Sequence, residues 1–386
     1  MQHLSFLEHY AHIIQTSSIS AFDEKIDESN RPIIDLLASW LADFGFSINI
    51  QSVPGTNNKF NMLARIGSGE GGLLLCGHSD TVPFDEGRWQ SDPFKLTQKD
   101  DKLYGLGTCD MKGFFAFILE ALKTIDLTKL TKPLYILASA DEETSMAGAR
   151  FFAQQQLIKP SMAIIGEPTE LVPIYKHKGH IAQSLNIQGK AGHSSDPAKG
   201  VNAIEIMYQA IGQLMDLQTS LKAKYHDDAF TVPHVTMNLG HIHGGDGENR
   251  ICGQCLLNFD LRAVPELSDA EALAMIEAAL APVKERFPNR LSLDLMYPTA
   301  PSFACKDEQN IIELAEKLTG KKAKSANYAT EAPFINLLGC DTLVLGPGSI
   351  EQAHQPDEFM ALAYVDPTVR VLQQFIQGVC IAQTSN

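Results

Sequence analysis

The sequence has little that would place it in a membrane or on a nucleic acid. Its 386 residues contain no apolar run near the roughly 20 residues that span a bilayer. It has only 31 lysines and arginines against 46 aspartates and glutamates, so its formal charge is −15 at pH 7. This charge argues against nucleic acids and anionic membrane surfaces as partners. The first residues lack a basic stretch followed by an apolar core, so we expect no secretory signal and a cytoplasmic location.

Cysteine is also scarce. The seven cysteines are odd in number, which argues against a disulfide framework and suits a reducing compartment. Cys252 and Cys255 form a single C-x-x-C motif inside the strand-like run 250–262. The second ligand pair that a zinc site needs is absent. We therefore expect two small buried side chains in a sheet, not a metal or redox site.

What remains is typical of a globular protein with more than one domain. Hydrophobic residues make up 44% of the chain and charged residues 20%, which is ordinary for a protein that buries a core. At about 150 residues per domain, the length predicts two or three domains. We find no internal repeat and no low-complexity segment.

Up to about residue 180, helical patterns alternate with short apolar strands. A helix is expected over 30–45, with Asn30 as its cap and Gly45 at its end. Buried strands are expected at 73–76, 134–138, 163–165 and 343–345, and further helices at 114–122 and 368–380. Apolar strands separated by helices predict an α/β domain whose mostly parallel sheet is covered by helices.

A different order occupies residues 181–296. Strand, helix, two strands, helix and strand are expected at 181–187, 201–214, 235–242, 251–261, 269–284 and 291–296. This order is that of a ferredoxin-like α+β unit. We therefore predict that 181–296 form a second domain, inserted between the two parts, 1–180 and 297–386, of the α/β domain.

Acidic residues and a histidine follow the expected strands. His78 and Asp80 follow the run 73–77, Asp110 follows 104–109, Asp141, Glu142 and Glu143 follow 134–140, and Glu167 follows 163–166. A single acid in such a place is usually a turn or cap residue. In an open α/β sheet, however, ligands bind beyond the carboxyl ends of the strands, so these groups should converge. Crowded carboxylates repel one another unless a cation compensates them, so we predict a divalent metal site.

The ligand types narrow the choice of metal. Imidazole and carboxylate without thiolate fit zinc, cobalt or manganese better than magnesium. Several carboxylates also allow two ions that share a bridging group. His78 and Asp80 point the same way in an extended segment, so Asp80 can orient the imidazole ring. Glu142 and Glu143 point in different directions, so one can bind metal while the other acts on the attacking water.

These segments resemble the signature blocks of the M20 metallopeptidase and deacylase family. The similar blocks lie at 77–83, 107–113, 141–143 and 166–168, in the order of the family, and the likeness covers about residues 70–360. The inserted domain resembles the lid and dimerisation domain of that family. The resemblance implies a hydrolase with two divalent ions, zinc or cobalt, as cofactors.

The same resemblance implies a set of metal ligands. His78 and Glu167 would hold one ion. Glu143 and His354 would hold the second, and Asp110 would bridge the two. His354 comes from this resemblance alone, because a single loop histidine is ordinarily incidental.

Roles in catalysis also follow from the resemblance. Glu142 would be the general base, which takes a proton from the attacking water and passes it to the leaving amine. Asp80 would be the carboxylate that orients His78. A cis peptide bond would follow the bridging residue, at Asp110–Met111.

The lid segment 192–195 resembles one whose histidine reaches the active site of a partner subunit. His193 would then stabilise the oxyanion in a homodimer. By the same resemblance Asn249 and Arg262 are expected to bind a substrate carboxylate, which suits the planar fork of arginine.

Substrate choice rests on fewer residues. Segments 328–334, 345–349 and 353–358 are most similar to family members that remove acetate from N2-acetyl-L-ornithine in arginine biosynthesis. Glu331 would then face the ammonium group of this small N-acylated amino acid.

Two alternatives remain. The first is a related enzyme with the same metal blocks, such as a succinyl-diaminopimelate desuccinylase, a broad acylamino-acid hydrolase or a dipeptidase. The second is a metal-stabilised binding protein without turnover. Loss of the base would be its expected sign, whereas Glu142 and every ligand position are present.

Overall fold

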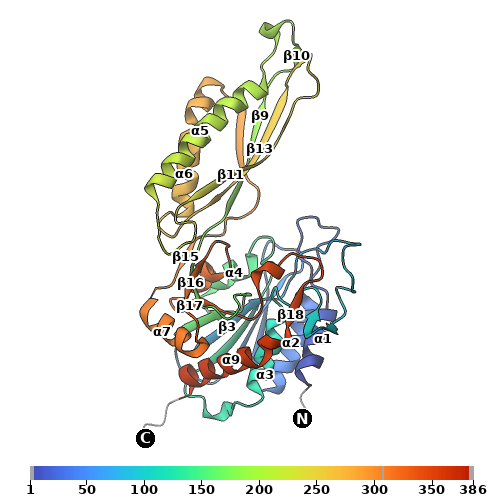
Figure 1. The fold of residues 1–386 in the computed structure, drawn as a ribbon, viewed down its shortest axis with the longest axis vertical. Coiled ribbons are helices and arrows are strands. Elements are labelled where there is room, and N and C mark those ends of the chain that lie inside the picture. Colours follow the sequence, from blue (N-terminus) through green and yellow to red (C-terminus); the bar gives the residue numbers. More distant parts are fainter. Residues whose placement is uncertain (1–3, 307, 382–386) are drawn as a thin grey trace. The chain divides into compact units, whose positions relative to one another are not determined.

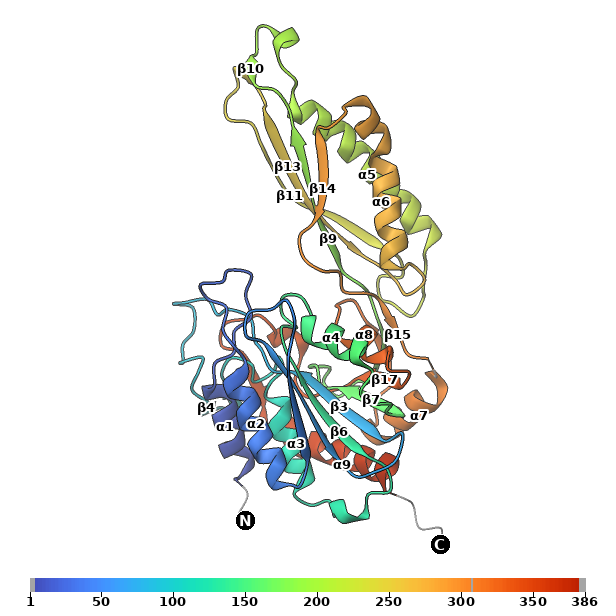
Figure 2. The ribbon, with the colours of Figure 1, turned by 180° about the vertical axis from the view of Figure 1, so that it is seen from behind.

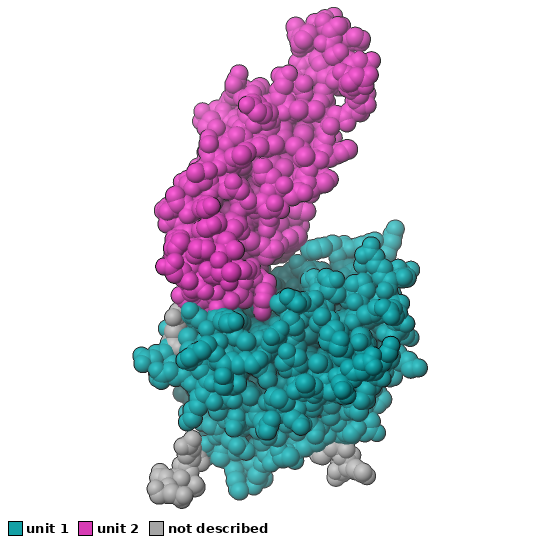
Figure 3. Space-filling view, in the orientation of Figure 1, with its two compact units in different colours: residues 1–175, 305–324, 330–386 teal, residues 176–304, 325–329 magenta. Residues whose placement is uncertain are grey.

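The computed structural model describes residues 4–306 and 308–381, and the chain divides into two compact units (Figure 3). Unit 1 comprises residues 1–175, 305–324 and 330–386, and unit 2 comprises 176–304 and 325–329. The sequence placed the inserted part at 181–296. None of the helices in the described residues is long and apolar enough to cross a bilayer.

The largest sheet has nine strands, most of them in unit 1 (Figures 1 and 2). They are β1 (Ser47–Ser52), β2 (Phe60–Ile66), β3 (Leu73–His78), β6 (Leu134–Ser139), β7 (Met162–Ile165), β8 (Ile174–His177), β15 (Phe303–Ala304), β16 (Lys324–Ala326) and β17 (Asp341–Val344). Their order is β1-β2-β6-β3-β7-β17-β8-β15, with β16 beside β8. β6, β3, β7 and β17 are parallel neighbours. The parallel centre explains why β3 and β6 are apolar and buried along their whole length.

The helices of unit 1 pack on this sheet or on one another. They are α1 (Phe6–Gln15), α2 (Arg31–Asp43), α3 (Phe114–Leu122), α4 (Ala147–Gln155), α7 (Glu308–Thr319), α8 (Ala332–Asn336) and α9 (Val365–Cys380). α3 and α9 contact each other and β3, while α8 contacts β7 and β17. α2 ends before Gly45, whose φ of +90° an L side chain rarely adopts. Asn30 precedes α2 but makes no side-chain cap; it bonds elsewhere, as described below.

A small antiparallel sheet in unit 1 is built from distant segments. β4 (Thr97–Lys99) and β18 (Phe359–Ala361) flank β5 (Lys102–Tyr104). Phe359 is the register partner of Tyr104. This pairing brings the segment that contains His354 beside the loop that contains Asp110.

Unit 2 has a four-stranded antiparallel sheet with two helices. Its main elements are β9 (Ile181–Gln188), α5 (Ala203–Lys224), β11 (Thr236–Gly244), β13 (Gln254–Arg262), α6 (Asp269–Arg286) and β14 (Leu291–Leu295). The order β11-β13-β9-β14 is the ferredoxin-like order, which the sequence predicted. A short pair, β10 (Gly192–His193) and β12 (Arg250–Ile251), extends from it.

The core of unit 2 explains a difference in helix length. α5 was expected to end at residue 214, but it continues to Lys224. Leu217 and Leu221 extend the buried stripe of the helix against the sheet. Cys252 and Cys255 belong to the same core and are free. The fold class predicted from the sequence, an α/β domain with an inserted α+β domain, is therefore confirmed.

Candidate metal centre

The candidate site lies where three parallel strands of unit 1 end. His78 is the last residue of β3 and is the register partner of Ser139, the last residue of β6. β7 lies on the other side of β3 and ends two residues before Glu167. Parallel strands bring their carboxyl ends to one edge, so the residues that follow them are neighbours. The edge is the one that the sequence predicted.

Asp110 lies between two histidines. Its Oδ1 is 3.2 Å from Nε2 of His78, and its Oδ2 is 3.6 Å from Nε2 of His354. Glu167 Oε1 is 3.9 Å from the same nitrogen of His78. Glu143 Oε2 is 3.0 Å from Nε2 of His354. The five residues expected to hold metal thus form two pairs, with one oxygen of Asp110 turned to each.

The electrostatics of this group fit a cation. Burial raises the pKa of Glu143 and raises that of Glu167 well above its usual value, and neighbouring carboxylates add to both shifts. Glu143 Oε1 is buried and has no hydrogen-bond partner within residues 4–306 and 308–381. Ligand atoms of His78, Asp110 and Glu143 all lie within 4.8 Å of one another. A buried oxygen without a donor, in a crowd of carboxylates, suits a divalent ion.

His78 itself is completely buried. Burial alone would lower its pKa, but the hydrogen bonds with Asp110 and Asp80 and the charge of Glu167 raise it well above the usual value. Its Nδ1 lies 3.0 Å from the backbone oxygen of Asp80 and 3.6 Å from Oδ1 of the same residue. When the ring is neutral, a proton on Nδ1 leaves Nε2 unprotonated, which is the form that binds a metal.

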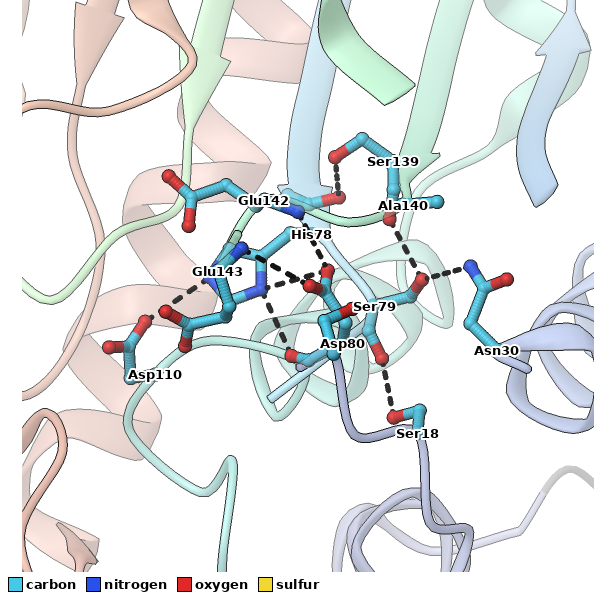
Figure 4. A network of polar contacts seen from close by, with 12 residues as sticks. Ser18, Asn30, His78, Ser79, Asp80, Asp110, Ser139, Ala140, Glu142 and Glu143 are labelled. Atoms are coloured by element: carbon cyan, nitrogen blue, oxygen red, sulfur yellow. Dashed lines mark hydrogen bonds and ion pairs between the residues drawn. The ribbon is translucent and has the colours of Figure 1, made fainter. Parts of the chain in front are cut away.

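Asp80 connects His78 to the loop of the two adjacent glutamates. The backbone N–H of Glu142 donates to Asp80 Oδ1 at 3.3 Å, and that of Glu143 donates to Oδ2 at 3.2 Å (Figure 4). Burial acts to raise the pKa of Asp80, but its hydrogen bond and charge interaction with His78 lower it. Asp80 therefore remains ionised. Its carboxylate interacts with His78 and accepts the backbone N–H groups of Glu142 and Glu143.

Glu142 differs from the other acids in its side-chain contacts. Its carboxylate makes no hydrogen bond to any of the described residues and is half-buried. Burial raises its pKa well above the usual value, and the charges of Glu167 and Glu143 raise it further. A carboxylate with raised proton affinity and free oxygens can accept a proton from water and donate it again.

A polar network holds the chain behind the site (Figure 4). Ser18 Oγ donates to the backbone oxygen of Ser79 at 2.7 Å, and Ser79 Oγ donates to that of Ser139 at 2.8 Å. The Asn30 side chain donates to Ser79 Oγ at 2.8 Å and also accepts from the backbone N–H of Phe60. The segment after β3 is thus fixed from both sides.

Lys59 secures the segment around Ser18. Its side chain is buried, and its Nζ donates to the Ile19 and Glu28 backbone oxygens, to Ser20 Oγ and to Asp27 Oδ1, at 3.2, 2.7, 3.0 and 2.7 Å. A buried ammonium is tolerated only when it is paired and hydrogen-bonded to this extent.

Two predicted residues lie at the tip of unit 2. His193 is exposed, in β10, and the backbone N–H of Ser195 donates to its Nδ1 at 3.2 Å. Since Nδ1 accepts, Nε2 of the neutral ring carries the proton and can donate it. Asn249 is exposed, and its backbone oxygen accepts from the Ser194 N–H at 3.0 Å. Its side chain makes no hydrogen bond to other described residues.

Arg262 is at the other end of that unit. Its Nε donates to Asp260 Oδ2 at 3.0 Å, and its terminal nitrogens bond to no other described residue. His180 Nε2 lies 3.7 Å from the same oxygen of Asp260. Burial and the charge of Arg262 lower the pKa of His180 to about 4, so the ring is neutral. Asp260 therefore orients the guanidinium of Arg262 through Nε, and the two terminal nitrogens are available to bind a ligand.

Glu331, expected at the substrate ammonium, is completely buried in unit 1. Its Oε2 accepts from Ser139 Oγ at 2.8 Å, with Cys76 Sγ at 3.8 Å. Its Oε1 has no partner within the described ranges. Burial raises its pKa to about 7.

The expected cis bond at Asp110–Met111 is wrong, because every peptide bond in the described residues is trans. The loop turns instead through positive φ values at Gly105 and Gly107, +153° and +80°. Sequence reasoning also missed Glu358, which is buried and accepts three backbone N–H groups of this loop. Only its place four residues after His354 could have drawn attention to it.

The chain is similar in sequence to one protein family and in fold to several solved structures. The profile of peptidase family M20/M25/M40 matches residues 74–378. A tripeptidase from Staphylococcus aureus is 20% identical, with a TM-score of 0.74 and 97% of each chain covered. An M20 family metallo-carboxypeptidase from Sulfolobus solfataricus is 19% identical, with a TM-score of 0.74 and coverage of 97% of this chain and 99% of that one. A dinuclear metal-binding M20 peptidase from Bacillus subtilis is 14% identical, with a TM-score of 0.67 and 97% of each chain covered.

Proposed function

The chain belongs to peptidase family M20/M25/M40 and is therefore a hydrolase; from this premise we propose that it removes acetate from N2-acetyl-L-ornithine. The observation that carries the hydrolytic part is the position of Asp110 between His78 and His354, at 3.2 and 3.6 Å. The acetylornithine part is supported by the likeness of segments 328–334, 345–349 and 353–358 to family members with that activity.

The donor set is suited to two divalent ions, with zinc and cobalt as the metals that fit it. His78 and Glu167 would hold one ion, Glu143 and His354 the other, and Asp110 both. Bound there, the ions would supply Lewis-acid polarisation of the amide carbonyl and would lower the pKa of the attacking water. Their positive charge would also offset the crowding that raises the pKa values of Glu143 and Glu167.

Glu142 is the general base in this proposal. Its carboxylate takes a proton from water as the water attacks the acetyl carbonyl, and then passes that proton to the nitrogen of ornithine as the amide bond breaks. Its raised pKa supports the second step, because a weaker acid holds the proton until the amine leaves. Asp80 orients His78 and the loop that carries Glu142.

Residues of unit 2 would bind the substrate. His193 is a donor at Nε2, as an oxyanion requires. We expect it to act on the active site of a second subunit, so the active species would be a homodimer. Arg262, with an open guanidinium edge, would bind the α-carboxylate. Asn249 lies at the opposite end of unit 2, beside His193, so it would reach the same carboxylate only from the second subunit. In unit 1, Glu331 has an unpartnered oxygen that an ornithine ammonium could satisfy. The free, buried cysteines suit the reducing cytoplasm.

A substrate panel tests this function. Purified enzyme is loaded with zinc or with cobalt and assayed on N2-acetyl-L-ornithine, other acetyl-, formyl- and succinyl-amino acids, succinyl-diaminopimelate, a dipeptide and a tripeptide. We expect the highest kcat/KM on N2-acetyl-L-ornithine. A higher value on succinyl-diaminopimelate or on a peptide would reassign the substrate and keep the hydrolase. No hydrolysis of any member would reject the function altogether.

A further inference from the structure

Glu358 belongs to the same segment as His354 but faces another part of the site. It is four residues further along the chain, just before β18, and its side chain is 2% exposed. β18 pairs with β5, which leads directly into the loop 105–110. One segment therefore carries a metal-ligand candidate and, a turn later, a carboxylate buried against the loop of a second candidate, Asp110.

The contact between Glu358 and this loop is extensive. Its Oε2 accepts from the backbone N–H of Gly107 at 2.9 Å. Its Oε1 accepts from those of Cys109 and Asp110 at 2.6 and 2.9 Å. Its own backbone oxygen accepts from the N–H of Gly105 at 3.1 Å. Successive N–H groups that converge on one anion form a backbone nest.

The donor count requires a carboxyl group at position 358. Oε1 accepts two N–H groups and Oε2 accepts one, which a carboxyl group can do in either protonation state. A glutamine would turn its own NH2 group toward one of these donors. Burial and the charge of Asp110 raise the pKa of Glu358 to about 8, so an acid is not placed here because a charge is favourable; it is held by the three N–H groups that it accepts.

A buried lysine follows Asp110 in the same loop. Lys112, two residues after Asp110, is completely buried and donates to the backbone oxygen of Thr16 at 2.8 Å. Burial lowers the pKa of Lys112 to about 8, and the charge of Glu358 acts in the opposite direction. The loop itself is packed tightly: a Cβ on Gly107 would lie 2.7 Å from Cε of Lys112. Glu358, Lys112 and the loop thus form one rigid support.

We propose that Glu358 is the positioning residue for Asp110. By holding the N–H groups of Gly107, Cys109 and Asp110, it fixes the backbone from which the Asp110 carboxylate faces His78 and His354. Because Glu358 and His354 lie on one segment, the contact of Glu358 with the loop positions the two ligand candidates Asp110 and His354 together. This inference rests on the proposed function, in which Asp110 bridges two ions.

Cobalt binding tests the proposal with a readout that does not depend on turnover. Metal-free wild-type enzyme and the variants Glu358→Gln and Glu358→Asp are titrated with Co2+, by calorimetry and by visible absorption, and then assayed. The matched control is Glu351→Gln, which removes the same charge from an exposed position on the same segment. Circular dichroism checks that each variant is folded.

We expect two Co2+ per wild-type chain and the same affinity in Glu351→Gln. Glu358→Gln should bind about 10- to 100-fold more weakly, the usual cost of losing a group that orients a ligand. Its absorption bands should shift and its kcat should fall more than its KM rises. Glu358→Asp keeps the charge but cannot reach all three N–H groups, so it should also lose affinity; if Glu358→Gln does not fold, this variant carries the test.

The possible outcomes distinguish a failure of the positioning role of Glu358 from a failure of the two-metal site. Wild-type affinity and spectrum in folded Glu358→Gln, or in Glu358→Asp, would overturn the positioning role and leave the two-metal site intact. Equal weakening in Glu351→Gln would also overturn it, because charge alone would then explain the loss. A wild-type chain that binds no Co2+ would overturn the proposed function together with this inference.

Discussion

The carboxylate of Asp80 accepts a hydrogen bond of 3.2 Å from the backbone N–H of Glu143. The same carboxylate lies 3.6 Å from the ring of His78. Two candidate ligands from different strand ends, one for each proposed ion, are therefore held by one side chain. The carboxylate of Asp80 also accepts a hydrogen bond from the backbone N–H of Glu142, the proposed base.

This relationship predicts that Asp80→Asn damages catalysis through geometry. The new NH2 group would face a backbone N–H in place of an acceptor, and His78 would lose its anionic neighbour. We expect kcat to fall roughly 10- to 100-fold, with metal affinity reduced in proportion. Steady-state kinetics and metal analysis measure both. Asp85→Asn, an exposed change of the same charge, should leave both values unaltered; an equally active Asp80→Asn would contradict the role.

Glu142→Gln should separate metal binding from turnover. Glutamine keeps the shape but cannot take a proton from water, so we expect kcat to fall by about 10²- to 10⁴-fold. Metal content should stay at the wild-type level, because the side chain of Glu142 is not among the expected ligands. Near-normal turnover by a metal-replete variant would remove Glu142 from its proposed role.

Metal uptake should release a proton from His354. Its hydrogen bond to Glu143 raises the pKa of His354 from 6.5 to about 9, so the metal-free protein holds this ring protonated at pH 7. A metal needs the neutral ring, so this proton alone should make the apparent affinity rise up to about tenfold per pH unit below pH 9. The raised pKa values of His78, Glu143 and Glu167 would add to this dependence. Calorimetry in two buffers of different ionisation enthalpy counts the protons. His354→Asn should release about one fewer; an unchanged count would refute this source.

Acid should destabilise the protein partly through His177, which is fully buried in β8. Burial lowers the pKa of His177 from 6.5 to about 4. Between these values the unfolded chain binds more protons, so the contribution is present above pH 6.5 and is lost as the pH falls toward 4. From pH 7 to 5 the loss is about 2 kcal/mol.

Metal-free His177→Phe provides the comparison, since its ring can replace the contact of His177 with Phe303. Its free energy of unfolding in urea should fall by about 2 kcal/mol less than that of the wild type between pH 7 and pH 5. Parallel losses in the two proteins would show that the pKa of His177 is the same in the folded and the unfolded protein, and would contradict this prediction.

Arg262→Lys should distinguish bidentate hydrogen bonding of the substrate carboxylate from electrostatic attraction alone. Lysine keeps the cation but cannot donate two parallel bonds to a carboxylate. We expect KM for N2-acetyl-L-ornithine to rise about 10-fold or more, the equivalent of roughly 1.4 kcal/mol. For the same substrate as its α-amide, wild type and variant should differ little. An equal rise on acid and amide would mean that Arg262 does not bind the carboxylate.

The strand-end part of the site could be predicted from the sequence. Apolar runs such as the one before His78 define buried parallel strands, and the rule for carboxyl ends then brings Asp80, Glu143 and Glu167 together. His354 and Glu358 follow no such run. They reach the site because β18 pairs with β5 across more than 250 residues of chain, and no local pattern encodes that pairing.

Other features depend on contacts between residues far apart in the chain, which a local sequence pattern does not show. The predicted end of α5 was too early because the sequence becomes mostly polar between Asp216 and Ser220, and the burial of Leu217 and Leu221 depends on their packing in the core of unit 2. Asn30 was expected to cap α2, but its side chain is used by Ser79 and Phe60. A cap residue has several competing partners, and tertiary structure decides among them.

The chain offers no accessible thiol of its own, since all seven cysteines are buried and none of them forms a disulfide. A single cysteine introduced on the surface of each unit would therefore be the natural target of a maleimide dye. Energy transfer between such a donor and acceptor would report the separation of the two units in solution, with and without substrate. Such single-molecule measurements would not require replacement of the native cysteines.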